Sequence, residues 1–390
     1  MQNMIKIKTF NNISAKGLER LPASDYDVSP DHESPDAIIL RSYNLHDYPV
    51  PDSLKAVGRA GAGTNNVPVK VMSEHGIPVF NAPGANANAV KELVIAGMLL
   101  ACRNICQAWR YASNVEGTPE QQSKAVEDGK KKYVGYELPG RTLGVVGLGA
   151  IGVKIANAAV ALGMRVVGFD PTITVRSAWK LSADVQEMAS IDELVKQADF
   201  VTFHVPLIDA TKNLMNAARL ASMKDGSVIL NFARDGIVDD DAVLAAIENG
   251  KVGAYVTDFP SQKLKNNEHV ITLPHLGAST VEAEDNCAIM VADELREFLE
   301  NGNIYNSVNF PAIKLPRAGG ARLAIANQNM PDMVAQISHV LGQAGANIKH
   351  MRNESSDGLA ITLLDLDEPV SEEIIAKIKA INGVLSARQI

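Results

Sequence analysis

The stretch from Arg141 to Asp170 restricts the possible fold of this chain more than any other. A short apolar run leads into glycines at 147, 149 and 152, a helical segment follows, and a second apolar run ends in Asp170. At such a strand-to-helix turn, the first glycine of G-x-G-x-x-G permits a tight bend. The second lets the backbone approach a pyrophosphate, and the third lets helix and strand pack closely. The pattern predicts a Rossmann-type unit that binds a dinucleotide.

The acid at the end of the second run indicates which dinucleotide is bound. Asp170 is suited to accept hydrogen bonds from the adenosine ribose hydroxyls, and its charge would repel a 2′-phosphate. The nearest cation, Arg176, comes six residues later. These residues favour NAD over NADP, although a strand-end Asp that only caps a turn is the alternative.

Length and composition set the protein class. With 390 residues, 46% of them hydrophobic and 21% charged, the chain has material for two or three packed domains. A net charge of −8 argues against a nucleic-acid partner. We find no signal peptide and no bilayer-spanning apolar run, so we expect a cytoplasmic protein without a membrane partner. Cys102 and Cys106, four residues apart, are expected on one face of a helix as buried thiols, and we expect no metal site.

The order of segments predicts the organisation of the chain. Apolar runs alternate with helical segments up to residue 80 and again from 141 to 277, as in βα units. Between them we expect one long helix over 89–106 and a solvated loop over 113–133. A helix over 280–300 is followed by a Pro- and Gly-rich linker at 311–320. The last seventy or so residues predict strand, helix, strand, strand, helix, strand, which is a ferredoxin-like order.

Two strand ends carry residues suited to hydride chemistry. Oxidation of a 2-hydroxy acid needs a base for the hydroxyl proton and a cation for the carboxylate. The run SVILNFAR delivers Arg234 to the carboxyl end of a buried strand, and VITLPH delivers His275 in the same way. Ligands of α/β sheets bind at this edge. A single Arg or His there is usually structural, but the pair after a dinucleotide motif predicts a catalytic site.

The sequence resembles the D-2-hydroxy-acid dehydrogenase family, from about Ala37 to the C-terminus. The matching segments are LGVVGLGAIG (143–152), ADFVTFHVPL (198–207), VILNFARDGIVDDDAVLAAIENGKVGAYVTDFP (228–260), TLPHLGAST (272–280) and APGANANAVKELV (82–94). The resemblance implies that Arg234 binds the substrate carboxylate and carbonyl and that His275 is the acid/base. It also implies contacts with NAD, with Asp258 near the nicotinamide amide; the expected cofactor residues are Gly147, Gly149, Ala150, Ile151, Gly152, Asp170, Pro206, Phe232, Ala233, Asp258, Gly277 and Ala278.

Within the family, the segments at 58–69 and 83–99 and the C-terminal module are similar to enzymes that oxidise 3-phosphoglycerate. A phosphate group needs cations beyond Arg234. Arg41 ends the run AIILRS and Arg59 ends LKAVGR, so both can reach one sheet edge. The resemblance implies that the substrate is held by Arg41, Ser42, Arg59, Ala62, Gly63 and Asn86. The alternative is that Arg59 pairs with a carboxylate inside its own domain.

The C-terminal module resembles an ACT domain, a small regulatory fold that binds amino acids. Asn329 and Asn347 occupy positions that contact an amino-acid effector in some relatives. Two residues depart from that pattern. Asp332 stands where the pattern N-x-P-G has glycine, and Asn327 stands where a His is usual. We interpret Asp332 as a helix cap that would crowd and repel a carboxylate.

A third departure concerns the partner of the catalytic imidazole. Relatives carry a Glu that pairs with the His, shortly after the segment that corresponds to Phe259–Pro260. Gln262 aligns with this Glu, and we expect it to orient His275 without adding negative charge. Glu268 is the alternative if the loop folds back.

We therefore predict two Rossmann-like, doubly wound parallel-sheet domains and a C-terminal ferredoxin-like ACT domain. The predicted limits are 1–98 with 281–312 for substrate binding, 99–280 for NAD and 318–390 for regulation. The expected reaction is oxidation of 3-phosphoglycerate to 3-phosphohydroxypyruvate, the entry step of serine biosynthesis, by a homodimer or homotetramer. The alternatives are a glyoxylate or hydroxypyruvate reductase and a non-catalytic, NAD-sensing corepressor.

Overall fold

The computed structural model describes residues 4–390, so the first three residues of the predicted 1–98 segment lie outside the described residues. The chain divides into two compact units. One consists of the residues up to Asn86 together with Val281–Ile390, and the other is Ala87–Thr280. The domain limits drawn from the sequence stay a prediction. The first limit lies inside a helix that packs within the second unit, on the sheet and on the helix that follows the glycines.

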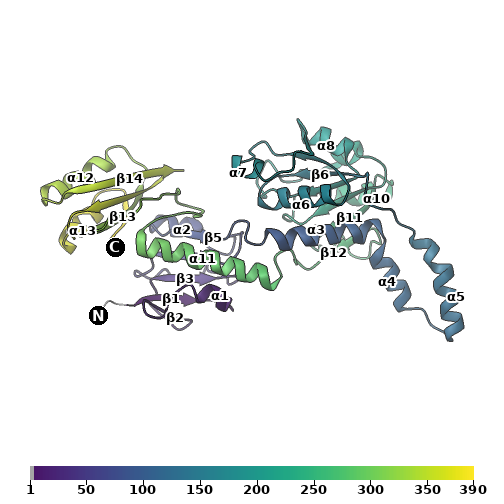
Figure 1. Ribbon diagram of the computed structural model, residues 1–390, viewed down its shortest axis with the longest axis horizontal. Coiled ribbons are helices and arrows are strands. Elements are labelled where there is room, and N and C mark those ends of the chain that lie inside the picture. Colours follow the sequence, from purple (N-terminus) through teal and green to yellow (C-terminus); the bar gives the residue numbers. More distant parts are fainter. Residues whose placement is uncertain (1–3) are drawn as a thin grey trace. The chain divides into compact units, whose positions relative to one another are not determined.

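A five-stranded parallel sheet forms the centre of the first unit (Figure 1). Its continuous apolar strands, such as AIIL, are buried because helices cover both faces of a parallel sheet. The strands are β1 (Ile5–Thr9), β2 (Tyr26–Ser29), β3 (Ala37–Leu40), β4 (Ala56–Arg59) and β5 (Val79–Asn81), in the order β2-β1-β3-β4-β5. The helices are α1 (Ala15–Leu18), α2 (Val69–Glu74) and α11 (Val281–Asn301).

The second unit contains a seven-stranded parallel sheet. The predicted α/β class with Rossmann-type sheets is thus confirmed. The strands are β6 (Thr142–Val146), β7 (Arg165–Phe169), β8 (Val185–Glu187), β9 (Phe200–Phe203), β10 (Ser227–Asn231), β11 (Val252–Thr257) and β12 (Val270–Thr272), in the order β12-β11-β10-β9-β6-β7-β8. The helices are α3 (Ala87–Cys102), α4 (Ile105–Ser113), α5 (Pro119–Gly129), the 3-10 helix η1 (Lys130–Tyr133), α6 (Ala150–Ala161), α7 (Val175–Ala178), α8 (Ile191–Gln197), α9 (Ala217–Ser222) and α10 (Asp240–Glu248).

Two predictions for the region after residue 89 are wrong. The expected long helix is interrupted at Asn104, which adopts a left-handed conformation (φ 51°), so Cys102 and Cys106 belong to different helices. The expected loop over 113–133 is largely helical. Thr118 caps α5 by accepting from the N–H of Gln121, whose side chain accepts from Thr118 N in return, and Pro119 occupies the first turn. Helices α4 and α5 project from the rest of their unit (Figure 1).

The C-terminal residues form a four-stranded antiparallel sheet with two helices, in the predicted order. The elements are β13 (Ala321–Gln328), α12 (Met333–Gln343), β14 (Ile348–Ser356), β15 (Leu359–Leu366), α13 (Glu372–Lys379) and β16 (Val384–Gln389), with sheet order β14-β15-β13-β16. One face packs on α12 and α13 through residues such as Leu323 and Ile325. The other face contributes Ala324 and Leu363 to the core around α11. Apolar packing of this second face attaches the module to the rest of the first unit.

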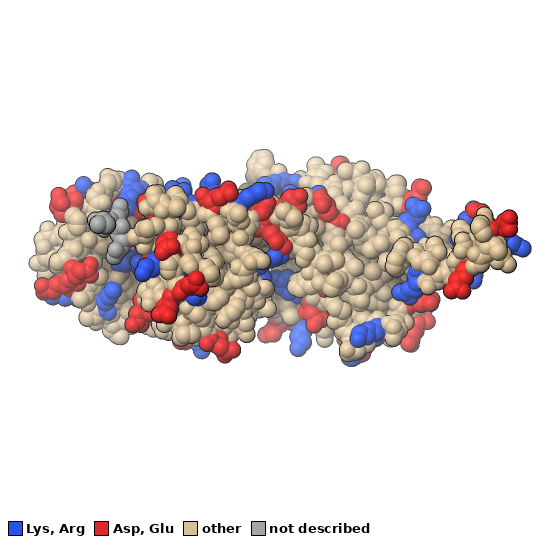
Figure 2. All heavy atoms as spheres, turned by 90° about the horizontal axis from the view of Figure 1, so that it is seen from below, with Lys and Arg blue, Asp and Glu red and all other residues tan. Residues whose placement is uncertain are grey.

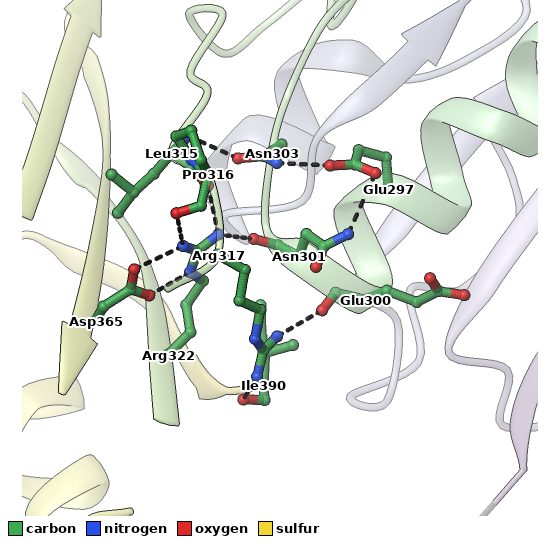
Figure 3. Close-up of polar contacts among 10 residues, drawn as sticks. All are labelled: Glu297, Glu300, Asn301, Asn303, Leu315, Pro316, Arg317, Arg322, Asp365 and Ile390. Carbon is green, nitrogen blue, oxygen red and sulfur yellow. Dashed lines mark hydrogen bonds and ion pairs between the residues drawn. The ribbon is translucent and has the colours of Figure 1, made fainter. Parts of the chain in front are cut away.

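A buried ion pair reinforces this attachment (Figure 3). Arg322 and Asp365 are both 0% exposed, and their side chains form two hydrogen bonds of 2.6 and 2.8 Å. The remaining guanidinium N–H groups donate to backbone oxygens of Asn301, Leu315 and Pro316. All five donors of the arginine are used, so the charge is paired and its hydrogen bonds are satisfied. Removing one partner from such a pair typically costs about 3–5 kcal/mol.

Charged side chains are mixed on the surface. Acidic and basic groups are interspersed among other residues over the face drawn in Figure 2. No helix among residues 4–390 has both the length and the apolar character needed to cross a bilayer.

Helix α11 carries a buried carboxyl group. Glu294 is 5% exposed; one oxygen accepts from Asn306 Nδ2, and the other has no hydrogen-bond partner in the structure. Burial raises the pKa of Glu294 to about 7. The neighbouring Asp293 also raises this pKa, and the Asn306 bond opposes the rise.

We predict that Glu294→Gln removes a pH-dependent term from stability. The pKa of Glu294 is about 7 in the folded chain and about 4.5 when unfolded. The contribution of the protonated carboxyl group to the stability of the folded chain is therefore fully present below about pH 4.5. It is lost as pH rises through about 7. At about pH 8 the variant should have a free energy of unfolding higher by about 1–3 kcal/mol. Denaturant titrations followed by circular dichroism measure this, with the exposed Glu282→Gln as control. An unchanged pH dependence would contradict the prediction.

Candidate active site

The predicted residues of the second unit follow the carboxyl ends of its strands. Strand register places the ends of β10, β11 and β12 side by side, because Asn231 pairs with Thr257 and Thr257 pairs with Thr272. Arg234, Asp258 and His275 lie within three residues of these ends. Strand β6, which precedes the glycines, lies between β9 and β7, where the strand order reverses. Ligands of open α/β sheets bind at this position.

The glycine loop has the geometry that a pyrophosphate needs. Gly147 has φ 93°, and a Cβ there would lie 2.5 Å from His204 O. A Cβ on Gly152 would lie 1.9 Å from Gly147 O, so the helix could not approach the turn. By contrast, a Cβ on Gly149 would meet nothing within 4 Å. At exposed Gly149 the loop therefore presents open space in front of the N-terminus of α6, where backbone N–H groups attract phosphate. Gly149, Ala150, Ile151 and Gly152 can hold a dinucleotide there.

Asp170 fastens the end of β7 to the glycine loop. One carboxylate oxygen accepts from Leu148 N at 2.8 Å, and the other accepts from Thr172 N and Thr172 Oγ1. The turn-capping contact that the sequence left as an alternative is thus present. Because the residue is only partly buried and each carboxylate oxygen can accept more than one hydrogen bond, a ribose contact remains compatible with this geometry.

Buried Asn231 shapes the turn that carries Arg234. Its side chain donates to Arg234 O at 3.0 Å and accepts from Ala233 N at 3.2 Å. The Arg234 side chain is held by a 2.6 Å bond from its Nη1 to Ala233 O, while the residue as a whole is exposed. Phe232 and Ala233 are buried, and Pro206, after β9, is exposed.

Asp258 fixes the backbone around His275. Asp258 is 1% exposed. Its two carboxylate oxygens accept hydrogen bonds from Leu276 N and Gly277 N, each at 2.7 Å. The backbone oxygen of Asp258 also accepts from His275 N at 3.1 Å. His275 has φ 57°, a conformation that non-glycine residues rarely adopt. Three hydrogen bonds to one residue hold this strained turn, with Gly277 buried and Ala278 partly buried next to it.

The structure does not bring the expected partners to the His275 ring. Gln262 is exposed, and within residues 4–390 no hydrogen bond joins it to His275. Glu268 precedes β12 whereas His275 follows it, so the two lie at opposite ends of that strand. The imidazole is exposed and has the Phe259 ring at a centroid distance of 5.2 Å.

In the first unit, Arg41 and Arg59 lie at the carboxyl ends of adjacent strands. Leu40 pairs with Arg59 in the register of β3 and β4. Arg41 forms a 2.6 Å ion pair with Glu284 of α11. The Arg59 guanidinium lies against the next loop, because a Cβ on Gly61 would be 1.7 Å from its Nη1. Sequence reasoning missed Glu284, since only the fold places the start of α11 at this edge.

Asparagines organise the loops around these arginines. The side-chain oxygen of Asn11 accepts from the backbone N–H groups of residues 41, 42 and 43, so Ser42 N already has a partner. Asn81 donates to Ala62 O at 2.6 Å, next to Gly63. The side-chain oxygen of Asn86 is buried without a hydrogen-bond partner, which fits a residue that contacts a ligand.

His204 is a further residue that sequence reasoning did not single out. It follows β9, and its backbone oxygen contacts the glycine turn. Burial lowers the pKa of His204 to about 3, so the ring stays neutral at physiological pH. Its Nε2 lies 2.9 Å from Thr202 Oγ1, and its Nδ1 has no hydrogen-bond partner in the structure.

The predicted regulatory residues lie at opposite strand ends of the C-terminal sheet. Strands β13 and β14 both pair antiparallel with β15, so they run in the same direction. Asn329 follows the end of β13, and Asn347, which donates to Asp367 at 2.7 Å, precedes the start of β14. Asp332 is the N-cap residue of α12, as interpreted from the sequence, but it has φ 68° and its side chain forms no capping hydrogen bond. A turn with positive φ explains why the pattern has glycine there.

No cluster of three His, Cys, Asp or Glu side chains suitable for a metal occurs among residues 4–390. Comparison with known families gives a match of residues 95–278 to the D-isomer specific 2-hydroxyacid dehydrogenase, NAD binding domain. The chain is 33% identical over 347 residues to D-3-phosphoglycerate dehydrogenase of Haemophilus influenzae, covering 86% of this chain and 81% of that protein.

Solved structures support the fold. An apo D-mandelate dehydrogenase of Rhodotorula graminis matches with TM-score 0.68 at 24% identity, covering 80% of this chain and 99% of that one. An NAD⁺-bound 3-phosphoglycerate dehydrogenase of Entamoeba histolytica matches with TM-score 0.61 at 23% identity, covering 79% of this chain and 99% of that one.

We predict that Asp258→Asn loosens the turn at His275. An amide side chain has one acceptor oxygen, and its NH₂ group would face an N–H donor, so at least one of the two bonds is lost. Leaving a buried N–H without a partner costs about 1–3 kcal/mol. Hydrogen exchange of the peptide spanning 270–280 should speed up by at least about tenfold, while the peptide of the glycine loop exchanges as before. Equal protection in both proteins would show that the carboxylate does not hold the turn.

Proposed function

Because the chain belongs to the D-isomer specific 2-hydroxyacid dehydrogenase family, we propose that it oxidises D-3-phosphoglycerate to 3-phosphohydroxypyruvate with NAD. This reaction is the entry step of serine biosynthesis. The observation that most supports this substrate is the 33% sequence identity to a relative named for this activity, over 81% of that relative. The placement of two arginines on adjacent strand ends of the first unit supports it.

The residues of the second unit have the chemistry that this reaction needs. The nicotinamide ring, when bound, supplies the hydride acceptor. His275 removes the proton of the substrate hydroxyl, and Arg234 holds the carboxylate and carbonyl oxygens. Asp258 is a positioning residue that keeps the His275 turn in place, and one further lone pair on its carboxylate can accept from the nicotinamide amide. No carboxylate is hydrogen-bonded to the His275 ring within residues 4–390.

We assign the preference for NAD to Asp170. Its carboxylate would repel a 2′-phosphate, and it is anchored to the glycine loop by Leu148 N, so it cannot readily turn away. The residues proposed for the pyrophosphate are those of the loop and of the first turn of α6.

Arg41 and Arg59 are proposed to bind the phosphate, with Asn86 and the backbone at Ala62 and Gly63. A phosphate carries nearly two charges and accepts several hydrogen bonds, which two guanidinium groups satisfy. A glyoxylate or hydroxypyruvate reductase would need no such pair. A non-catalytic corepressor would need neither the acid/base His275 nor Arg234.

We propose that the C-terminal module is an ACT regulatory domain. One effector can contact Asn329 and Asn347 together only if two copies of the chain supply them, because in one chain these residues lie at opposite strand ends of the sheet. Asp332 adds negative charge beside Asn329, in a cavity of about 390 Å³ that they share with buried Asn327. A carboxylate ligand such as serine should therefore bind weakly.

The projecting helices support a homodimer or homotetramer. Ile105 and Trp109 lie four residues apart on one face of α4, and they are 43% and 70% exposed. Val126 of α5 and Val134 after η1 are also exposed. A second copy of the chain would bury these apolar groups.

The proposed substrate predicts a selective effect of Arg41→Ala and Arg59→Ala. Each variant loses a charge-assisted contact with phosphate worth about 1.5–3 kcal/mol. The KM for phosphohydroxypyruvate should rise about tenfold to hundredfold, whereas the KM for hydroxypyruvate should change little. Steady-state reduction of both substrates measures this. Equal effects on the two substrates would assign these arginines a structural role.

The proposed interface predicts that Trp109→Asp weakens self-association. A buried charge without a partner opposes assembly. Light scattering after gel filtration should show a smaller mass for this variant than for the unmodified chain. The matched control is Trp179→Asp, because Trp179 is 86% exposed and lies outside the projecting helices. If both variants keep the parent mass, the interface lies elsewhere.

A further inference from the structure

The guanidinium proposed to bind phosphate already has a carboxylate partner. Arg41 Nη1 lies 2.6 Å from Glu284 Oε1, although the two residues are 243 positions apart in the sequence (284 minus 41). Both belong to the first unit, where Glu284 lies in the first turn of α11. An incoming anion has to compete with this carboxylate for Arg41.

The ion pair between Arg41 and Glu284 is weak enough for an incoming anion to displace it. The two side chains are 34% and 42% exposed, and ion pairs with this degree of exposure contribute only about 0–1 kcal/mol. The backbone of Arg41 is held by Asn11 and Asn66, so opening the pair requires side-chain rotation only. Once released, Glu284 is still favoured by the positive end of the helix dipole. The released state is therefore not an isolated charge.

We propose that Glu284 is a positioning residue that sets substrate specificity through Arg41. This inference rests on the proposed function. In the absence of substrate the Glu284 carboxylate neutralises Arg41. When the distal group of a substrate carries a single charge, Arg41 only exchanges one carboxylate partner for another. The substrate then gains almost no binding free energy from Arg41. A phosphate brings nearly two charges and three oxygens, so it displaces Glu284 with a net gain.

Three ligands separate the contributions, with 2-oxobutyrate as a fourth for comparison with 2-oxoglutarate. Phosphohydroxypyruvate carries a distal phosphate, and 2-oxoglutarate has the same backbone length with a carboxylate in place of the phosphorus. Hydroxypyruvate has no distal anion. The substitution Glu284→Gln removes the competing charge but keeps the size of the side chain. The control Glu282→Gln removes one charge from the same helix turn, where no hydrogen bond or ion pair joins it to Arg41 among the described residues.

Glu284→Gln should lower the KM for both ligands with a distal anion about three- to fivefold. The kcat values should stay unchanged, and so should the KM for hydroxypyruvate. In the unmodified chain 2-oxoglutarate should therefore show no advantage over 2-oxobutyrate, which lacks the distal carboxylate, and in the variant it should gain one. Raising the ionic strength should shrink the difference between the two proteins. Glu282→Gln should reproduce none of these selective changes.

Two results would overturn the inference. An unchanged or raised KM for phosphohydroxypyruvate in both Glu284→Gln and Glu284→Ala would show that the pair only supports the loop. An equal fall in the KM for all ligands, hydroxypyruvate included, would show that Glu284 acts only as a negative charge near the site and not through the distal group of the substrate. Failure of the proposed function is distinct, because the unmodified chain would then not turn over phosphohydroxypyruvate at all.

Discussion

Strands that run in one direction have all their carboxyl ends on one side of the sheet, and the residues proposed for the active site depend on that constraint. In the first unit the register of β3 with β4 brings Arg41 and Arg59 together. In the second unit the registers of β10, β11 and β12 bring together Arg234, Asp258 and His275. No two of these residues are neighbours in the sequence. The parallel pairing, which continuous burial of strands such as VILN and AIIL favours, makes them neighbours in space.

The loops at these edges are held by polar side chains that accept hydrogen bonds from the backbone; two of these side chains, Asn231 and Asp258, are buried. Asn11 accepts from three consecutive N–H groups, Asn231 clamps the turn of Arg234, and Asp258 clamps the turn of His275. In buried Ala233 and Gly277, such contacts satisfy backbone N–H groups that would otherwise lack partners. They also hold a strained residue such as His275 in a conformation that it would leave in a free loop. The proposed site thus depends on hydrogen-bond acceptors that hold its loops in place.

The sequence predicts those parts of the fold that local pattern determines. The glycine turn, both parallel sheets and the six C-terminal elements follow from apolar runs and punctuation, and the structure has them. Asn104 was missed because its left-handed conformation ends α3 without a glycine or proline to mark it. Helix α5 was missed although Thr118, Pro119 and Gln121 form a recognisable start, because its polar composition was interpreted as a loop. The contact of Glu284 with Arg41 and the surroundings of Gln262 depend on the tertiary structure, which no local sequence pattern predicts.

The attachment of the C-terminal module limits how it can influence the rest of its unit. Arg322 uses every donor, and three of its bonds go to the end of α11 and to the linker, so the linker is fixed despite Gly319 and Gly320. Ala324 and Leu363 pack into the core around α11. A displacement of the module therefore either breaks a buried, fully paired guanidinium or carries α11 with it. Because α11 begins beside Arg41, through Glu284, the second outcome connects the module physically to the sheet edge that carries the arginines.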